Sequence, residues 1–255
     1  MKGTGYIPSK KDLRNYRINK ACRTQELPKE YKVEHARIKD QKSVSSCVAF
    51  STSSVLEEAL GKKYSTAWIY GYRPNDYYQG EGMSTLDALR TIHKIGFVEE
   101  RELKGNYEMD KAKEVVDYYL STNPTINNKV MGYACLHNIQ EIKQAIYTTG
   151  LPIVLSIATN GMWIDENNII IIPDEATGGH QMVCYGWNET GLLLQNSWGE
   201  SFGDKGCCIL PYEYPVSEAW VIKFDKPEEI MEKPKLYWLR NLIMKIVKII
   251  RRLRK

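Results

Sequence analysis

Cys47 and His180 are of the residue types that nucleophilic catalysis by a thiolate requires. Cys47 lies in the stretch "QKSVSSCVAF", where apolar residues begin to recur at helical spacing. The positive end of a helix dipole lowers the pKa of a thiol at the helix N-terminus and so favours the thiolate. A protonated His180 nearby would favour the same ionisation and could then deliver the proton to a leaving group.

His180 and Asn196 are expected to meet because they flank the open end of a predicted hairpin. His180 opens the run "HQMVCYGW", and Asn196 directly follows the run "GLLLQ". An antiparallel turn centred near residue 189 places position 180 opposite roughly position 197. An imidazole and an amide can therefore come together at that end of the two strands.

Three sequence blocks carry a resemblance to a known family. "QKSVSSCVAFS", "GGHQMVCYGW" and "QNSWGESFGDKG" resemble the signature blocks of the papain family of cysteine peptidases, over about residues 27 to 215. "LPKEY" stands where a mature papain-like enzyme begins, and "QGEGMSTLDALRTIHKIGF" is similar to the family's glycine-bearing substrate strand and the helix after it. The spacings from Cys47, 133 residues to His180 and 149 to Asn196, are typical of this family.

The resemblance implies a cysteine endopeptidase that hydrolyses peptide bonds through an acyl-thioester intermediate. Cys47 would be the nucleophile, His180 the proton donor to the leaving amine, and Asn196 the residue that orients the imidazole. Gln41 would donate its side-chain amide to the developing oxyanion, beside the backbone N–H of Cys47. Trp198 would cover the bond between His180 and Asn196 and keep water away from it.

The resemblance also implies which residues would line a bound peptide. Gly82 would offer backbone hydrogen bonds to it, and Met83, Ser156 and Gly178, with the adjacent Gly179, would lie near the pocket for the side chain two residues before the cut. Such an uncharged, methionine-lined pocket predicts a preference for an apolar side chain. Nothing in the sequence resembles the inserted loops of exopeptidase relatives, which favours an endopeptidase.

The residues around the nucleophile depart from the family's usual pattern. Val48 stands where tryptophan is usual, Val44 where a cysteine is usual, and Ser45 where glycine is usual. The missing cysteine removes a disulfide partner that is common in secreted members. Two other functions stay open: an amidase or transferase on a papain-like scaffold, and a non-catalytic scaffold protein that retains the fold.

Composition and cysteine usage indicate a globular protein of the cytoplasm. The 255 residues are 43% hydrophobic, enough for a sizeable core, and the opening "MKGTGYIPSKKDLRNYR" lacks the apolar run of a secretory signal. The six cysteines are irregularly spaced without a CxxC pair, which argues against a zinc site and a disulfide framework. We expect no metal and no cofactor, and an arm before Leu27 too short for the family's usual inhibitory pro-region.

The order of predicted elements indicates an α+β protein with a helical left lobe and an antiparallel, β-rich right lobe. Residues 1 to about 35 are expected to form an extended arm. Helices are predicted to begin near Ser45 or Ser46, Ser65, Ser84, Met109 and Asn138. After residue 150, strands are predicted in "LPIVLSI", "NNIIIIP", "HQMVCYGW", "GLLLQNSW" and "GCCILPYEY". A substrate is expected in a cleft between the lobes.

The C-terminal segment has a character of its own. Residues 233–255 contain nine Lys or Arg and no Asp or Glu, which leaves the other 232 residues with a net charge of −5. The domains expected are an arm at 1–26, a peptidase domain at 27–225, and a linker with a basic amphipathic helix at 226–255. The helix, 235–255, could dock on the protein's own body or on a protein partner, or bind an anionic membrane surface, with nucleic acid the least favoured partner.

Overall fold

The computed structural model describes residues 5–10, 26–73, 81–103, 109–123 and 126–225 of the chain. The chain divides into one compact unit, Met1–Phe224, and a second unit, Asp225–Lys255. The predicted linker and C-terminal helix, 226–255, lie outside the described residues. In the described part, no helix is both long and apolar enough to cross a bilayer.

Five α-helices begin close to the predicted positions: α1 (Cys47–Leu60), α2 (Thr66–Gly71), α3 (Thr85–Arg90), α4 (Met109–Thr122) and α5 (Ile139–Thr149). The side chains of Ser65, Ser84 and Asn138 cap α2, α3 and α5 by accepting a backbone N–H three residues on. Gly61 and Gly150 close α1 and α5 in the left-handed conformation. Local capping signals therefore located these helices correctly.

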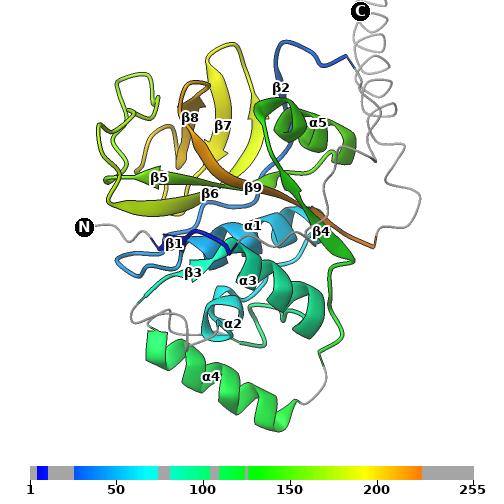
Figure 1. Ribbon diagram of the computed structural model, residues 1–255. Helices are drawn as coiled ribbons and strands as arrows, with labels where there is room; N and C mark the ends of the chain where they lie inside the picture. Colours follow the sequence, from blue (N-terminus) through cyan, green and yellow to red (C-terminus); the bar gives the residue numbers. More distant parts are fainter. Residues whose placement is uncertain (1–4, 11–25, 74–80, 104–108, 124–125, 226–255) are drawn as a thin grey trace, which may run out of the picture. The chain divides into compact units, whose positions relative to one another are not determined.

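The sheet has the strand order β4-β9-β5-β6-β7-β8, and all the neighbours are antiparallel. Its strands are β4 (Gly132–Leu136), β5 (Ile153–Thr159), β6 (Gly178–Trp187), β7 (Gly191–Gln195), β8 (Cys207–Pro211) and β9 (Val216–Lys223). A short strand, β2 (Tyr31–Lys32), pairs with β6. Figure 1 shows this sheet on the side of α1 opposite α2 and α4, so the two predicted lobes are present.

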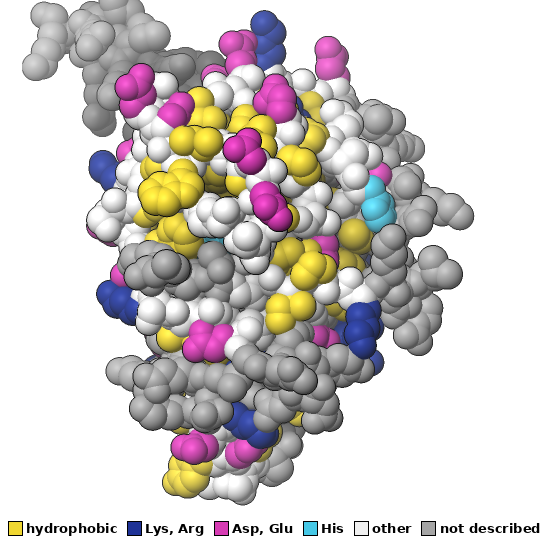
Figure 2. Space-filling model, turned by 60° about the vertical axis from the view of Figure 1, so that its left-hand side comes forward, with side chains coloured by type: hydrophobic (Ala, Val, Ile, Leu, Met, Phe, Trp, Pro, Cys, Tyr) yellow, Lys and Arg dark blue, Asp and Glu magenta, His cyan; other side chains and the backbone are white. Residues whose placement is uncertain are grey.

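The predicted strand "NNIIIIP" is wrong. Ile169 and Ile170 make only isolated bridges, to Ile209 and Ile164, whereas Ile171 and Ile172 are about half exposed, at 52% and 46%. The run looks like a buried strand in sequence, but part of it lies on the surface of the β5–β6 connection. Figure 2 shows a face of the molecule on which hydrophobic side chains lie among acidic ones.

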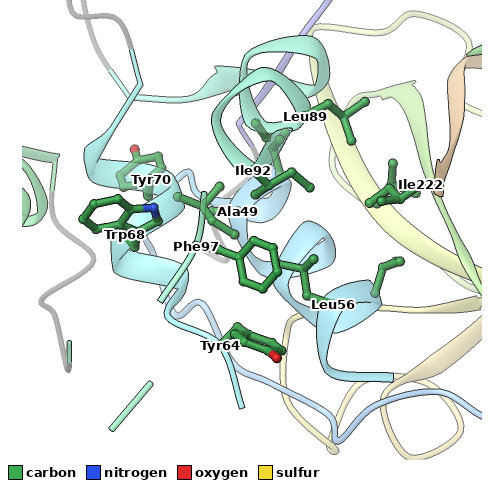
Figure 3. Close-up of a cluster of buried hydrophobic side chains, with 14 of the residues drawn as sticks. Ala49, Leu56, Tyr64, Trp68, Tyr70, Leu89, Ile92, Phe97 and Ile222 are labelled. Atoms are coloured by element: carbon green, nitrogen blue, oxygen red, sulfur yellow. The ribbon is translucent and has the colours of Figure 1, made fainter. Parts of the chain in front are cut away.

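Helix α1 lies at the centre of the helical lobe and is buried on nearly all sides. Every residue from Cys47 to Glu57 is buried, and Ala49 and Leu56 pack with Trp68, Leu89 and other apolar side chains (Figure 3). Small side chains on the remaining faces let the sheet approach closely, since α1 also contacts β5 and β6. The helix that carries Cys47 is therefore held by both lobes.

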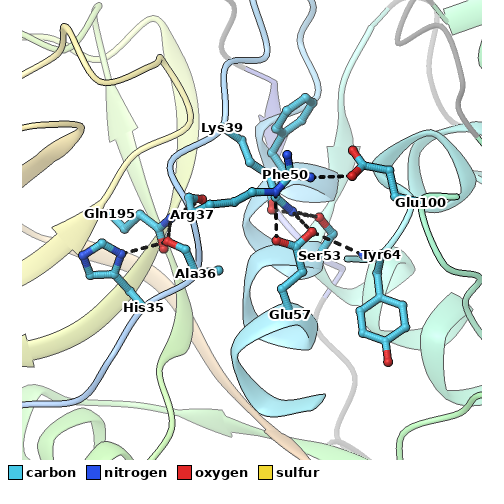
Figure 4. Close-up of polar contacts among 10 residues, drawn as sticks. All are labelled: His35, Ala36, Arg37, Lys39, Phe50, Ser53, Glu57, Tyr64, Glu100 and Gln195. Atoms are coloured by element: carbon cyan, nitrogen blue, oxygen red, sulfur yellow. Dashed lines mark hydrogen bonds and ion pairs between the residues drawn. The ribbon is translucent and has the colours of Figure 1, made fainter. Parts of the chain in front are cut away.

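A buried ion pair ties the segment before α1 to the helix (Figure 4). Lys39 Nζ lies 2.9 Å from Glu57 Oε1, and both side chains are only 6% exposed. Burial lowers the pKa of Lys39 to about 8, an effect that the Glu57 carboxylate opposes. On the other side, Gln195 at the end of β7 donates to the carbonyl of Ala36 over 2.8 Å. This segment thus joins the sheet to α1.

The N-terminal arm is partly built into the fold. Strand β1 (Tyr6–Ile7) pairs in parallel with β3 (Met83–Ser84), directly before α3 (Figure 1). The N–H of Gly5 donates to the carbonyl of Gly179 over 3.1 Å, and the N–H of Met83 donates to the carbonyl of Gly5 over 2.9 Å. The arm therefore bridges β3 and β6, the two segments that the sequence assigns to substrate binding.

Candidate active site

Cys47 is the first residue of α1 and is fully buried. Burial raises the pKa of its thiol to about 12, while the backbone N–H groups of Gln181, Val48 and Tyr6 act in the opposite direction by stabilising the thiolate. Gln181 directly follows His180 on β6, so the Cys47 sulfur lies against the part of β6 that carries His180. Cys47 and His180 thus lie on elements that contact each other, α1 and β6.

His180 is held by Asn196 as predicted. His180 Nε2 lies 2.8 Å from Asn196 Oδ1, which also accepts the backbone N–H of Ser197 over 2.7 Å. A backbone N–H can only donate, so the Asn196 atom that it contacts must be the side-chain oxygen. Because that oxygen can only accept, the proton of the bond to His180 is carried by Nε2. In the neutral ring, Nδ1 is then the basic nitrogen.

The surroundings of His180 exclude water. The imidazole is fully buried, and burial lowers its pKa to about 4, an effect that the bond to Asn196 opposes. The Trp198 ring lies 4.8 Å from the imidazole, between centroids, and packs edge-on with Phe202. Among the described residues, His180 Nδ1 has no hydrogen-bond partner.

Gln41 is fixed beside the start of α1. Its side-chain oxygen accepts the hydroxyl of Ser197 over 2.5 Å, and its amide nitrogen donates to the carbonyl of Val44 over 2.7 Å. A turn in which Val44 N–H donates to the Gln41 carbonyl holds the two residues together. Both ends of the amide are thereby oriented, and Gln41 is fully buried.

Burial opposes the charge state that the sequence predicts for this site. A thiolate and an imidazolium were expected, but burial raises the pKa of Cys47 to about 12 and lowers the pKa of His180 to about 4. Both shifts favour the neutral thiol and the neutral imidazole in the arm-bound structure. The cause is desolvation by burial, which the backbone N–H of Tyr6 opposes at Cys47 by stabilising the thiolate.

The arm lies on most of the predicted substrate residues. Gly82 and Met83 meet it at β1, and a Cβ added to Gly82 would lie 2.8 Å from the Gly5 carbonyl oxygen. Gly179 packs against Tyr6, where an added Cβ would lie 2.5 Å from the ring. Gly178 is exposed at the start of β6, opposite Thr159.

Ser156 is deeply buried, and its hydroxyl donates to Gln181 over 3.0 Å. The Gln181 side chain in turn donates to Ser51 over 2.7 Å, and Ser51 donates to the carbonyl of Cys47 over 2.8 Å. Sequence reasoning missed Gln181. Gln181 could have been identified as a candidate because it is a polar residue next to His180 in an otherwise apolar strand.

The sequence predicted uncharged surroundings for Met83 and Ser156, but an acidic residue, Glu218, lies beside Ser156. It stands opposite Ser156 in the β5–β9 ladder, and it accepts the Tyr6 hydroxyl over 2.8 Å. The sequence offered little warning, since β9 was not predicted and the pairing of Glu218 with Ser156 spans distant segments.

Metal-binding geometry is not found in the described residues, where no three His, Cys, Asp or Glu side chains are grouped to hold an ion. The cysteines described there, Cys47, Cys135, Cys184, Cys207 and Cys208, are free thiols. The arrangement can thus supply a thiol, a base and oriented amides from the protein alone.

Comparisons with known proteins agree with this fold. The family model for papain family cysteine proteases matches residues 24–214. Xylellain, a cysteine protease from Xylella fastidiosa, superposes with a TM-score of 0.72 at 22% identity, covering 88% of this chain and 97% of that one. A Carica candamarcensis cysteine protease in complex with E-64 superposes with a TM-score of 0.61 at 16% identity, covering 78% and 100%.

A curated relative is an uncharacterized peptidase C1-like protein of Acanthamoeba polyphaga mimivirus, 24% identical over 72% of this chain and 68% of that protein. The fold is that of the papain-like cysteine peptidases, with a helical and an antiparallel β lobe. The chain belongs to the papain family of cysteine proteases.

Proposed function

We propose that this protein is a cysteine endopeptidase in which Cys47 attacks the peptide carbonyl. The observation that carries the proposal is the hydrogen bond of 2.8 Å between His180 and Asn196, in a fold that also places a cysteine at the N-terminus of α1. That bond leaves His180 Nδ1 as the base for the Cys47 thiol. The acyl thioester would form as the protonated imidazole delivers its proton to the leaving amine.

The oxyanion would be bound beside the nucleophile. The backbone N–H of Cys47 and the side-chain amide of Gln41 are the donors that we assign to it, and Gln41 is already oriented by Ser197 and Val44. Water would then hydrolyse the thioester, with His180 acting as the base. Trp198 and Asn196 take no part in bond breaking and keep the imidazole in place.

We further propose that the arm-bound structure is a latent form. Residues Gly5–Ile7 pair with the backbone of Met83 and Gly179. A bound substrate would need the same backbone hydrogen-bonding groups. Peptide binding therefore requires the arm to leave. The arm was expected to be too short for the family's usual inhibitory pro-region, but a short stretch around Tyr6 reaches Cys47.

Reaction with E-64 followed by peptide mapping tests this function against its two alternatives. An adduct at Cys47 together with hydrolysis of unmodified peptides supports an endopeptidase. An adduct without hydrolysis would favour the amidase or transferase. If Cys47 stays unlabelled even after the arm has been displaced, the catalytic assignment fails and the scaffold protein is favoured.

A further inference from the structure

Gln181 carries a buried amide at the place where strand β6 meets the helical lobe. Its side chain is fully buried, and its oxygen accepts the hydroxyl of Thr85 and, over 3.0 Å, the hydroxyl of Ser156. Its nitrogen donates to the hydroxyl of Ser51 over 2.7 Å. The three partners belong to α3, β5 and α1, so one amide joins β6 to elements of both lobes.

The hydroxyl of Ser51 extends this network to the proposed nucleophile. It donates to the carbonyl of Cys47 over 2.8 Å, in the first turn of α1. A second contact is direct, because the backbone N–H of Gln181 stabilises the Cys47 thiolate. Gln181 therefore reaches Cys47 by two routes, one through the Ser51 hydroxyl and one through its own backbone.

The same network fixes the strand that carries the imidazole. Gln181 directly follows His180 on β6, so a side chain anchored at 181 also holds the backbone of His180. Successive side chains of a strand point to opposite faces, and the His180 ring makes its own bond to Asn196. A shift of β6 along α1 would leave buried polar groups unpaired, at a cost of about 1–3 kcal/mol each. The contacts of Gln181 thus resist such a shift.

We propose that Gln181 is a positioning residue that sets the position of the Cys47 thiol relative to the His180 imidazole. This inference rests on the proposed function. Its role differs from that of Asn196, which orients the imidazole ring, since Gln181 holds the backbone on which the ring is carried and the helix turn that bears the sulfur. An apolar side chain of similar size would fill the space but would remove the amide that the three hydroxyls share.

Gln181→Leu tests this role by steady-state kinetics of the full chain on one peptide. We expect kcat to fall about 10- to 100-fold while KM changes by less than about threefold, because a small misplacement of reacting groups costs rate rather than binding. Gln144→Leu is the matched control. Gln144 is also buried, at 7% exposed, but its amide donates to Thr148 within its own helix, α5, over 2.9 Å. It should leave kcat within about twofold of the parent.

Ser51→Ala interrupts the same route at a second point, because it removes the hydroxyl between Gln181 and Cys47 and alanine is favourable in a helix. It should lower kcat about 3- to 10-fold. The logarithmic losses of kcat in Ser51→Ala and Gln181→Leu should sum to more than the loss in the double variant, since residues of one network are not independent.

An unchanged kcat in Gln181→Leu, a loss no larger than that of Gln144→Leu, or full additivity with Ser51→Ala would overturn the assignment. If Gln181→Leu does not fold, as circular dichroism would reveal, Ser51→Ala decides alone, and a kcat within about twofold of the parent then overturns it. Failure of the proposed function would look different: the parent would cleave no peptide and E-64 would not label Cys47.

Discussion

The orientation of the His180 imidazole depends on Asn196, whose side-chain oxygen is itself fixed by the backbone N–H of Ser197. This makes Asn196 a positioning residue and His180 a reacting one. The loss of kcat/KM on substitution should therefore differ between the two residues.

We expect His180→Ala to lower kcat/KM by about 10³-fold or more, because both the base and the proton donor are lost. Asn196→Ala should cost less, about 10- to 100-fold, since the imidazole is still present but less well oriented. Steady-state kinetics on one peptide measures both. Equal losses in the two variants would contradict this division of roles.

At the scale of elements, β1 reaches the site, where the backbone of Tyr6 lies against Cys47. In the arm-bound state, burial raises the pKa of Cys47 to about 12 and lowers that of His180 to about 4, so the thiolate fraction is small near neutral pH. Displacing β1 should return water to both groups, lower the pKa of the thiol and raise that of the imidazole. The ion pair can then form.

Gly5→Val is designed to displace β1 without touching the peptide-binding residues. A Cβ on Gly5 would lie 2.1 Å from the carbonyl oxygen of Ser45, a backbone atom that cannot easily move. We expect iodoacetamide to alkylate Cys47 at least about 10-fold faster in this variant at pH 6, where the parent holds a neutral thiol.

The matched control is Gly132→Ala, since an added Cβ there meets nothing within 4 Å. Mass spectrometry after timed quenching gives the rates at Cys47. Identical rates for Gly5→Val and the parent from pH 5 to pH 8 would show that β1 does not suppress the thiolate.

A second prediction at the scale of elements concerns the ion pair between Lys39, before α1, and Glu57 in the helix. Lys39→Met leaves Glu57 buried with its nearest cation removed, and we expect a loss of about 3–5 kcal/mol in the free energy of unfolding. Urea denaturation measures it. Lys62→Met is the control, because Lys62 is 59% exposed in its pair with Glu99, and it should cost about 1 kcal/mol or less. Similar losses in the two would refute the structural role of Lys39.

At the scale of the whole molecule, the sequence predicted features that depend on local signals better than features that depend on long-range pairing. The caps at Ser65, Ser84 and Asn138 predicted three helices, and the hairpin turn brought His180 near Asn196. The pairing of β1 with β3 joins residues far apart in the chain and has no local signature. The position of the arm and that of Glu218 were missed for this reason, whereas Ile171 and Ile172 were mispredicted because their apolar run resembles a buried strand.

The basic segment 235–255 gives a prediction for the full chain. We propose that it binds an anionic membrane surface and takes no part in the chemistry, because its apolar residues recur at helical spacing between Lys and Arg. Vesicles containing anionic lipid should sediment the full chain in a salt-sensitive way, but not a chain ending at Asp225. If both chains stay in the supernatant, docking on the protein's body or on a partner is favoured.

The most direct test of the central claim is peptide hydrolysis by Gly5→Val with and without Cys47→Ala. Alanine is well tolerated at a helix start and removes only the sulfur, so the fold should be kept, as circular dichroism can verify. We predict that the variant with Cys47 cleaves peptides under reducing conditions and that Cys47→Ala reduces cleavage to the background rate. Cleavage that persists in Cys47→Ala would contradict the assignment of Cys47 as the nucleophile.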